Sequence, residues 1–289
     1  MTLHQLLNEG MGRLSRAGDP EASVDARRLL LEAFGLDTVH FLMRRMEPLE
    51  DTEAVRRAAK DYRQMVEKRC RRIPLQHILG TQDFMGLTFQ VNRHVLIPRQ
   101  DTETLVELVL EEQKDRRKRI LDLCTGSGCI AVSLAALGGY EDITAADLSE
   151  EALKVAGANG VRILGEDRIR LRKGDLFQAL EPGETFDILV SNPPYIPTKV
   201  IRGLEPEVKD HEPMMALDGE ADGLGFYRRI SAEAGPWLRP GAAVYLEIGH
   251  DQAESVCALL EEAGFGGIRV VKDLPGKDRV VRGELMSLR

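Results

Sequence analysis

The first part of the chain repeats hydrophobic residues at the spacing of one helix face. The residues that form this pattern are Leu3, Leu6, Leu7, Met11 and Leu14. Residues 18–20 then interrupt it, and Asp19 as a cap with Pro20 in the first turn predicts the start of a second helix. A third helix is predicted from about residue 52 to residue 72, before a proline. Residues 1–75 are therefore expected to form a small helical domain.

A different pattern follows at residues 81–91. Apolar residues alternate there around Gly86, and they are Phe84, Leu87, Phe89 and Val91. Alternation around a glycine is typical of a short β-hairpin. Residues 76–98 are therefore expected to link the helical domain to the rest of the chain through a hairpin.

From about residue 99 the chain alternates short apolar runs with helical patterns. The runs predict strands at residues 120–124, 142–147, 169–173, 186–192, 242–249, 268–273 and 279–285. Repeated strand, helix and strand imply a parallel, doubly wound α/β sheet with right-handed crossovers. The last two runs are too close for a long crossover, so we expect them to pair as an antiparallel edge. Residues 99–289 are predicted to be one α/β domain.

Composition narrows the class of protein. The chain has 289 residues, of which 43% are hydrophobic, as expected for a globular protein with a substantial core. No apolar stretch reaches the roughly 18 residues of a membrane span, and the charged N-terminus does not resemble a signal peptide. We therefore expect a cytoplasmic protein without a membrane partner. The four cysteines form neither a CxxC pair nor a Cys/His cluster, so neither a disulfide framework nor a metal site is expected.

The formal net charge of -8 argues against a surface that holds nucleic acid by neutralising phosphates. The basic run KRCRR at residues 68–72 is the best candidate for a local exception. It has two interpretations: a solvated helix end whose cations suit the negative pole of the helix, or a basic binding patch. The first is favoured, and no stable nucleic-acid binding is expected.

A glycine-rich segment, DLCTGSGCIA at residues 122–131, follows a predicted strand and opens a predicted helix. Gly126 and Gly128 therefore lie where the backbone turns sharply and approaches a ligand closely. Asp147 ends the next predicted strand. Asp147 follows Gly128 by roughly 20 residues, the spacing at which a carboxylate binds both ribose hydroxyls of an adenosine-containing cofactor. Together these features predict a bound nucleoside.

Two classes of cofactor fit this turn. The spacing of Gly126, Gly128 and Ala131 also satisfies the dinucleotide fingerprint, in which a pyrophosphate uses the free N–H groups of the helix. S-adenosylmethionine instead carries a sulfonium cation, which the strand-end acids Asp122 and Asp175 suit. Asp175 and Leu176, in the segment GDLF, would lie beside an adenine. Ordinary roles for these residues, a strand-end acid and a core leucine, stay equally open.

The segment SNPPYI at residues 191–196 ends the fourth predicted strand. Ligands of open parallel sheets bind outside the carboxyl ends of the strands, so this segment is expected to face the cofactor. Pro193 and Pro194 fix the backbone and remove two N–H donors, which leaves a rigid array of acceptors. The side-chain oxygen of Asn192 adds another acceptor, and Tyr195 can cover the flat face of a bound group.

Such a cradle suits a planar NH2 group, because Asn192 and the carbonyl of Pro193 can accept its two hydrogens. The predicted chemistry is in-line attack by this nitrogen on a sulfonium methyl. An amide nitrogen is a poor nucleophile because its lone pair is delocalised into the carbonyl. Holding both hydrogens raises electron density on the nitrogen, and no strong base is needed, since the proton can leave after transfer.

The chain resembles the release-factor glutamine methyltransferases, which methylate the glutamine of the Gly-Gly-Gln motif in peptide chain release factors. The resemblance covers nearly the whole chain. It is carried by DARRLL (25–30), PLQHILG (74–80), VLIPRQDTE (95–103), DLCTGSG (122–128), SNPPYI (191–196), HEPMMAL (211–217), DGLGFYRRI (222–230), LEIG (246–249) and KDRVVRGEL (277–285). The NPPY motif is shared with nucleobase methyltransferases, so the combination with PLQHILG and VLIPR is what makes the resemblance specific.

This resemblance implies a Rossmann-like class I S-adenosylmethionine-dependent methyltransferase sheet and an N-terminal helical domain that docks the release factor. The cofactor contacts that the resemblance implies are Cys124, Thr125, Gly126, Ser127, Gly128, Asp147, Leu176, Asn192 and Leu96. Asp175 is a further candidate, which was inferred above from the segment GDLF and not from the resemblance. The target glutamine would meet Asn192, Pro193, Pro194 and Tyr195.

The chain departs from the family pattern at two places. Cys124 stands where the family usually has glycine, which is expected to alter affinity for the cofactor more than to abolish binding. Gln100 and Asp101 stand where a Pro-Glu pair is usual. The acid at the helix start is kept, whereas the preceding turn loses the rigidity of proline.

Rival interpretations of the same motifs can be tested. A nucleic-acid amino methyltransferase would also use NPPY, but it would want a basic groove and aromatic stacking surfaces, and only 5% of the residues are aromatic. A nicotinamide-dependent oxidoreductase shares the glycine turn but leaves NPPY unexplained. A binding module without catalysis does not need a cofactor pocket beside an acceptor cradle.

Overall fold

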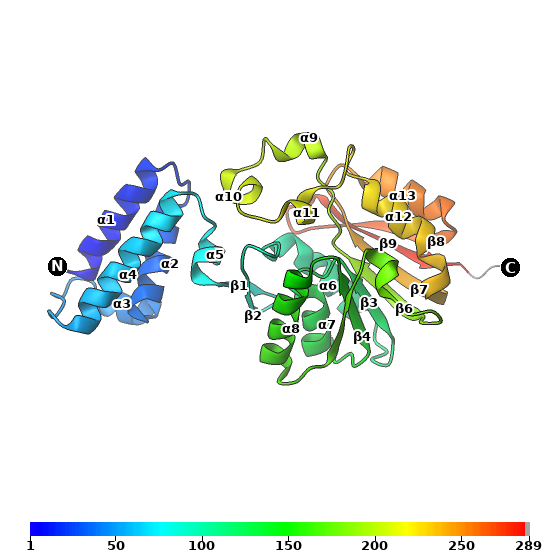
Figure 1. The fold of residues 1–289 in the computed structure, drawn as a ribbon, viewed down its shortest axis with the longest axis horizontal. Coiled ribbons are helices and arrows are strands. Elements are labelled where there is room, and N and C mark those ends of the chain that lie inside the picture. The colour runs from blue at the N-terminus through cyan, green and yellow to red at the C-terminus, as the bar shows by residue number, and fades with distance from the viewer. Residues whose placement is uncertain (287–289) are drawn as a thin grey trace. The chain divides into compact units, whose positions relative to one another are not determined.

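The computed structural model describes residues 1–286, which form two compact units (Figure 1). The helical unit comprises Met1–Gly80 together with a later segment, Glu205–His211. The α/β unit comprises Thr81–Leu204 and the residues from Glu212 on. One segment of the second half of the chain therefore folds with the first.

The helical unit consists of α1 (Leu3–Arg16), α2 (Ala22–Phe34), α3 (Thr38–Arg44), α4 (Glu53–Cys70), α5 (Leu75–Leu79) and α10 (Pro206–Lys209). Its core is apolar, with Leu6, Leu14, Leu29, Phe41 and Tyr62 fully buried. Thr2 and Thr52 cap α1 and α4 with their side chains, so both of these starts follow the sequence pattern.

The predicted start of α2 is wrong. The helix begins at Ala22 with Glu21 as N-cap, instead of using Asp19 and Pro20. The carboxylate of Asp19 accepts from the backbone N–H of Glu21 at 3.0 Å and is ion-paired with Arg69 at 3.1 Å. The local pattern predicted that Asp19 caps a helix, but its side chain pairs instead with Arg69, which is distant in sequence.

Arg69, in the basic run at residues 68–72, is buried, so the interpretation of a solvated helix end is wrong for this residue. Its guanidinium pairs with Asp25 at 2.6 Å, in addition to Asp19, and with Glu207 at 2.7 Å. Arg72 reaches Glu207 as well, at 2.6 Å. These ion pairs hold the segment Glu205–His211 in the helical unit.

The α/β unit contains, within the described residues, a seven-stranded sheet in the order β5-β4-β3-β6-β7-β9-β8. The strands are β3 (Ile120–Leu123), β4 (Ile143–Asp147), β5 (Ile169–Lys173), β6 (Phe186–Ser191), β7 (Leu238–Glu247), β8 (Phe265–Lys272) and β9 (Asp278–Leu285). The first five are parallel, and β9 runs antiparallel to both β7 and β8. The predicted doubly wound sheet with an antiparallel edge is confirmed. The predicted hairpin is present too, as β1 (Thr81–Phe84) and β2 (Leu87–Gln90).

Helices cover both faces of this sheet. On one face lie α6 (Gln100–Glu112), α7 (Cys129–Gly138) and α8 (Glu150–Leu164), packed over residues such as Ile120 and Ile188. On the other lie α12 (Gly225–Glu233) and α13 (Ala253–Glu262), packed over alternate residues such as Leu121 and Leu189. Both faces of the central strands are therefore largely apolar, which explains why these strands consist mostly of hydrophobic residues. Short helical turns complete the unit, namely α9 (Thr198–Ile201), α11 (Met214–Leu217), η1 (Leu176–Ala179) and η2 (Gly235–Trp237).

The strand order reverses beside β3. The chain runs outward through β4 and β5 and then returns to place β6 on the opposite side of β3. In open α/β sheets such a reversal opens a crevice at the carboxyl ends of the strands. Among the described residues, no helix combines the length and apolar character needed to cross a bilayer.

Candidate active site

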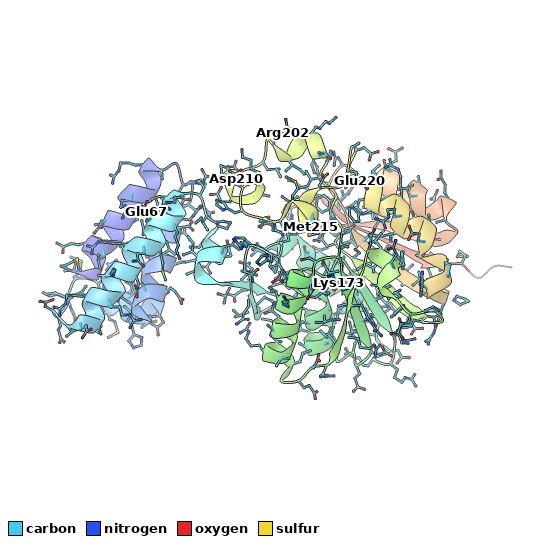
Figure 2. All side chains as sticks on the ribbon, viewed as in Figure 1. Glu67, Lys173, Arg202, Asp210, Met215 and Glu220 are labelled. Atoms are coloured by element: carbon cyan, nitrogen blue, oxygen red, sulfur yellow. The ribbon has the colours of Figure 1, made fainter. Side chains whose placement is uncertain are left out.

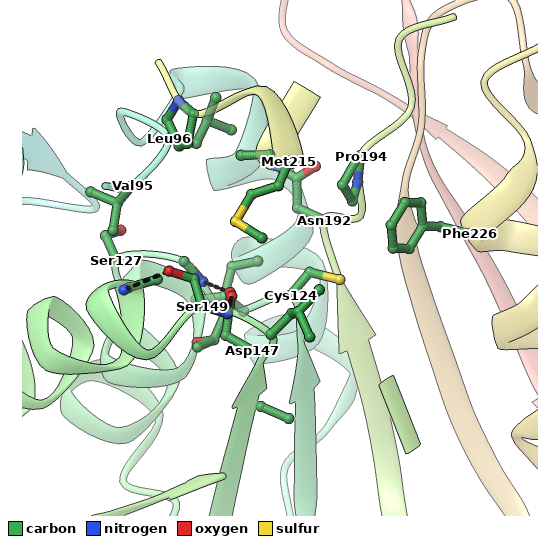
Figure 3. A pocket seen from close by; sticks show the side chains of 18 of the residues that line it. Val95, Leu96, Cys124, Ser127, Asp147, Ser149, Asn192, Pro194, Met215 and Phe226 are labelled. Atoms are coloured by element: carbon green, nitrogen blue, oxygen red, sulfur yellow. Dashed lines mark hydrogen bonds between the residues drawn. The ribbon is translucent and has the colours of Figure 1, made fainter. Parts of the chain in front are cut away.

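A pocket of about 330 Å³ lies at the carboxyl ends of β3, β4 and β6 (Figure 3). Its wall includes residues of all the segments in which the sequence predicted cofactor contacts. Those predicted residues that line it are Leu96, Cys124, Thr125, Gly126, Ser127, Asp147, Asp175, Leu176, Asn192 and Pro194. Three other predicted site residues, Gly128, Pro193 and Tyr195, are not among the described residues that line the pocket.

The turn from β3 to α7 brings bare backbone to the pocket. Gly126 and Gly128 adopt positive φ values of 55° and 79°, a region that favours glycine. A Cβ atom on Gly128 would lie 3.0 Å from the Cβ of Ala156 in α8, so this glycine also allows α7 and α8 to pack closely. Gly128 therefore shapes the turn from behind, although it does not line the pocket.

Cys124 begins this turn with a φ of 59°, a strained conformation for a residue with a side chain. Its thiol lines the pocket, and burial raises the pKa of this thiol well above its usual range. The side chain at this position is therefore a neutral, poorly ionised thiol that occupies space where a glycine would leave room.

Asp147 closes the turn from the tip of β4. One carboxylate oxygen accepts from the backbone N–H of Gly126 at 2.9 Å, and the other accepts from the N–H of Ser149 at 2.8 Å. Burial raises the pKa of Asp147, while these backbone hydrogen bonds oppose the rise. The carboxylate is thus held rigidly at the pocket wall, with lone pairs still available for a ligand's hydroxyls.

The two other acids considered for a cation differ in position. Asp122 is fully buried beneath the turn, where Thr125 donates to it at 2.6 Å, and burial raises its pKa to about 7. Asp122 is not among the described residues that line the pocket, so the structure does not support direct contact between its carboxylate and a cation bound there. Asp175 does line the pocket, and Arg229 pairs with it at 2.9 Å.

The SNPPY segment leaves β6 beside the tip of β3. Ser191 donates to the carbonyl of Leu123 at 2.7 Å, which ties the two strand ends together. Asn192 follows and donates its side-chain N–H to the hydroxyl of Thr102 at 3.2 Å. The carbonyl of Tyr195 accepts from Gln252 at 3.0 Å. Both ends of the two-proline step are therefore fixed by hydrogen bonds. Figure 3 shows Asn192 and Pro194 across the pocket from Asp147.

Several lining residues were not anticipated from the sequence. Met215 and Glu220, labelled in Figure 2, come from the segment between β6 and β7, and Phe226 is the second residue of α12. Figure 3 shows the Met215 side chain projecting into the pocket, although 48% of the residue is exposed. The only signal for Met215 and Phe226 was their place in HEPMMAL and DGLGFYRRI, two motifs that the family resemblance had brought to attention, whereas Glu220 lies between these motifs.

Arg99 and Glu212 join two walls of the pocket. The carboxylate of Glu212, which is almost fully buried, pairs with Arg99 at 2.7 Å and accepts from the N–H of Ile97 at 3.4 Å. Burial raises the pKa of Glu212, and Arg99 opposes the rise. This ion pair connects the segment that contains Leu96 with the segment that contains Met215.

Comparison with protein families divides the chain in a similar way. Residues 5–80 match the PrmC N-terminal domain, and residues 100–203 match the methyltransferase small domain. Two relatives are both named release factor glutamine methyltransferase. The one from Geobacter sulfurreducens is 40% identical, over 98% of this chain and 97% of its own length. The one from Caulobacter vibrioides is also 40% identical, over 98% of this chain and 96% of its own length.

A solved methyltransferase structure from Pyrococcus furiosus has a similar fold. The TM-score is 0.51 at 18% identity, with 71% of this chain and 91% of that chain covered. At this identity the likeness supports the fold of the α/β unit alone, in agreement with the sheet order.

Proposed function

The chain belongs to the release factor glutamine methyltransferase family, and we propose that it transfers a methyl group from S-adenosylmethionine to the side-chain amide nitrogen of the glutamine in the Gly-Gly-Gln motif of peptide chain release factors. One observation supports this most directly. The Asn192 amide lies at the pocket wall with its N–H end bonded to Thr102, which leaves its oxygen as an acceptor for an NH2 group.

The pocket residues fit the proposed cofactor. The carboxylate of Asp147 suits the two hydroxyls of a ribose, and the bare backbone at Gly126 permits a close approach. The wall is otherwise largely apolar, with Leu96, Leu176 and Phe226 available to contact a flat base. The remaining proposed contacts are Cys124, Thr125, Ser127, Asp175 and Asn192, while Gly128 shapes the turn behind them. When bound, S-adenosylmethionine supplies a methyl group on a positively charged sulfur.

The chain's own groups then position the amide. The side-chain oxygen of Asn192 and the carbonyl of Pro193 accept its two hydrogens, and Pro194 and Tyr195 keep the segment rigid. A nitrogen–carbon bond forms as the carbon–sulfur bond breaks, and the nitrogen afterwards loses one proton to solvent. Alignment of the reacting atoms contributes on the order of 7 to 11 kcal/mol in such reactions, so a stiff cradle is the main requirement.

The parts of the chain divide this work. We assign release-factor docking to the helical domain at residues 1–75, linkage to residues 76–98 and methyl transfer to residues 99–289. Because its substrate is a component of translation, the protein acts in the cytoplasm. The net charge of -8 and the apolar pocket wall do not favour a nucleic-acid substrate.

Mass spectrometry tests the proposal. The purified chain is incubated with S-adenosylmethionine and a Gly-Gly-Gln peptide or intact release factor, with DNA and RNA in parallel. We expect one added methyl group on the glutamine and none on the nucleic acids. Calorimetry should give binding of S-adenosylmethionine and no binding of NADH. Methylated nucleic acid beside unmodified release factor would establish the rival interpretation.

A further inference from the structure

Arg99 is the only arginine or lysine among the described residues that line the pocket. It is the N-cap residue of α6, and 40% of its side chain is exposed. The other charged residues of the described lining are acidic, namely Asp147, Asp175, Asp218 and Glu220. An anionic group of a ligand in this pocket is therefore repelled by most of the charged wall and attracted by Arg99.

The guanidinium of Arg99 is held in place but keeps free donors. Its Nη2 donates to the carboxylate of Glu212 at 2.7 Å, and that side chain is only 1% exposed. Glu212 also accepts from the backbone N–H of Ile97, at 3.4 Å, which fixes the carboxylate itself. Within the described residues, Nε and Nη1 of Arg99 have no hydrogen-bond partner. Because a guanidinium carries five N–H donors in a planar fork, Arg99 can bind a second oxyanion beside Glu212.

Another arginine of this chain shows that such sharing occurs in the same fold. Arg69 pairs with Asp19 at 3.1 Å, with Asp25 at 2.6 Å and with Glu207 at 2.7 Å. One guanidinium thus binds three carboxylates. Glu212 offsets part of the charge of Arg99, but a single partner does not exhaust its capacity for carboxylates.

We infer that Arg99 binds the carboxylate at the amino-acid end of S-adenosylmethionine. The inference rests on the proposed function. This carboxylate is the only anionic group of the cofactor, whose sulfonium and ammonium groups are cations. The planar fork of arginine matches the two oxygens of a carboxylate, and such charge-assisted hydrogen bonds are stronger than neutral ones. The acidic residues of the wall suit the two cationic groups instead.

Binding at Arg99 would restrain the reacting end of the cofactor. In S-adenosylmethionine the sulfur joins the ribose to the amino-acid chain, so Asp147 at the ribose and Arg99 at the carboxylate restrain it from both sides. Thr102 lies in the first turn of α6, three residues after Arg99, and accepts from the Asn192 amide at 3.2 Å. The same helical turn therefore carries the carboxylate anchor and supports the amide cradle.

Calorimetry with two ligands tests the inference. The ligands are S-adenosylmethionine and decarboxylated S-adenosylmethionine, which keeps the sulfonium and the amino group but lacks the carboxylate. We expect Arg99→Gln to weaken binding of S-adenosylmethionine by about 10-fold or more, and binding of the decarboxylated ligand by less than about 2-fold. The ratio of the two Kd values in one variant cancels any general loosening of the pocket. It should therefore fall about 5-fold or more from the wild-type ratio.

Arg228→Gln is the matched control. It removes the same charge from an arginine that pairs with Asp222 and is not among the described lining residues. The ratio of the two Kd values should stay at the wild-type value in this variant. Arg99→Lys keeps a cation beside Glu212 but loses the planar fork, so its ratio should lie between those of the wild-type chain and Arg99→Gln.

The outcomes separate the inference from the proposed function. A wild-type chain that binds NADH and not S-adenosylmethionine overturns the proposed function, and this inference with it. A wild-type chain that binds S-adenosylmethionine, beside an Arg99→Gln variant with an unchanged ratio, overturns this inference alone. The same holds if Arg99→Gln raises only the KM for the Gly-Gly-Gln peptide. If Arg99→Gln does not fold, Arg99→Lys decides: an unchanged ratio overturns the inference, and a ratio lowered by about 3-fold or more supports it.

Discussion

Substitution of Gly128 by alanine tests the packing behind the cofactor turn. The new Cβ would lie 3.0 Å from the Cβ and 3.2 Å from the Cα of Ala156, closer than side chains normally approach. Overpacking of this kind costs about 1 to 3 kcal/mol. The positive φ of 79° adds about 1 to 2 kcal/mol for a residue with a side chain.

Gly139 provides a matched control at the other end of α7. Its φ is 69°, and a Cβ placed on it would meet no atom within 4 Å. Gly139→Ala therefore carries the same backbone strain and the same change in the unfolded chain without the contact. The difference in free energy of unfolding between the two variants therefore measures the contact with Ala156 alone. Gly128→Ala should be less stable than Gly139→Ala by about 1 to 3 kcal/mol.

Urea denaturation followed by circular dichroism measures both variants, with equal m-values as a check that the unfolded states are comparable. Because the clash pushes α8 away from the turn, Gly128→Ala should also bind S-adenosylmethionine more weakly than Gly139→Ala. Equal loss of stability in the two variants would refute the argument that Gly128 is required by close helix packing.

Three further substitutions address the cradle, the cofactor site and the helical unit. Asn192→Ala should keep cofactor binding in calorimetry and lower turnover by roughly 100-fold or more, because one oriented acceptor is lost. Asp147→Asn should weaken cofactor binding by about 10-fold or more, since it replaces a charged acceptor held at the wall. Glu207→Gln should destabilise the chain by about 1 to 3 kcal/mol in thermal denaturation, because Arg69 and Arg72 lose a shared carboxylate. Burial acts to raise the pKa of Glu207, but hydrogen bonds from Arg72 and Arg69 hold it at about 2. Its contribution is therefore complete above about pH 4.5 and is lost as the pH falls towards 2, and Glu207→Gln should lack this loss.

Each of these has a control or a contradicting result. Turnover near wild type in Asn192→Ala would remove the proposed role of its oxygen. Unchanged calorimetry for Asp147→Asn would place the ribose elsewhere. For Glu207, the exposed pair of Arg56 and Asp51 is the control, because Asp51→Asn should change stability by less than about 1 kcal/mol. Equal effects of the two substitutions would contradict the special role of the buried pair.

The sequence predicted the sheet well because the central strands are buried on both faces. β3 and β6 appear as short runs of mostly apolar residues, in which Asp122 and Asp187 are exceptions, so both strands were visible locally. The contact between Asp147 and Gly126 was also foreseeable, since neighbouring parallel strands end at the same edge. Local pattern and topology were enough for this part of the site.

Other features depend on partners far away in the sequence. Arg69 looked like part of a solvated basic run because its carboxylate partner Glu207 lies 138 positions further on. Asp19 looked like a helix cap because nothing nearby indicated its pairing with Arg69. Met215 lies in the four-residue turn α11, which has no hydrophobic periodicity, so its place at the pocket could not be derived from spacing. Phe226 lies in α12, and the spacing of a helix does not show which cavity its first turn lines.

The central claim is that the SNPPY segment orients a carboxamide for methyl transfer, and a crystal structure tests it directly. The complex would contain the chain, S-adenosylhomocysteine and a Gly-Gly-Gln peptide. We predict the glutamine NH2 group within hydrogen-bonding distance of the Asn192 side-chain oxygen and the Pro193 carbonyl, with its nitrogen facing the cofactor sulfur. A glutamine bound elsewhere, or an Asn192 oxygen turned away from it, would contradict the account.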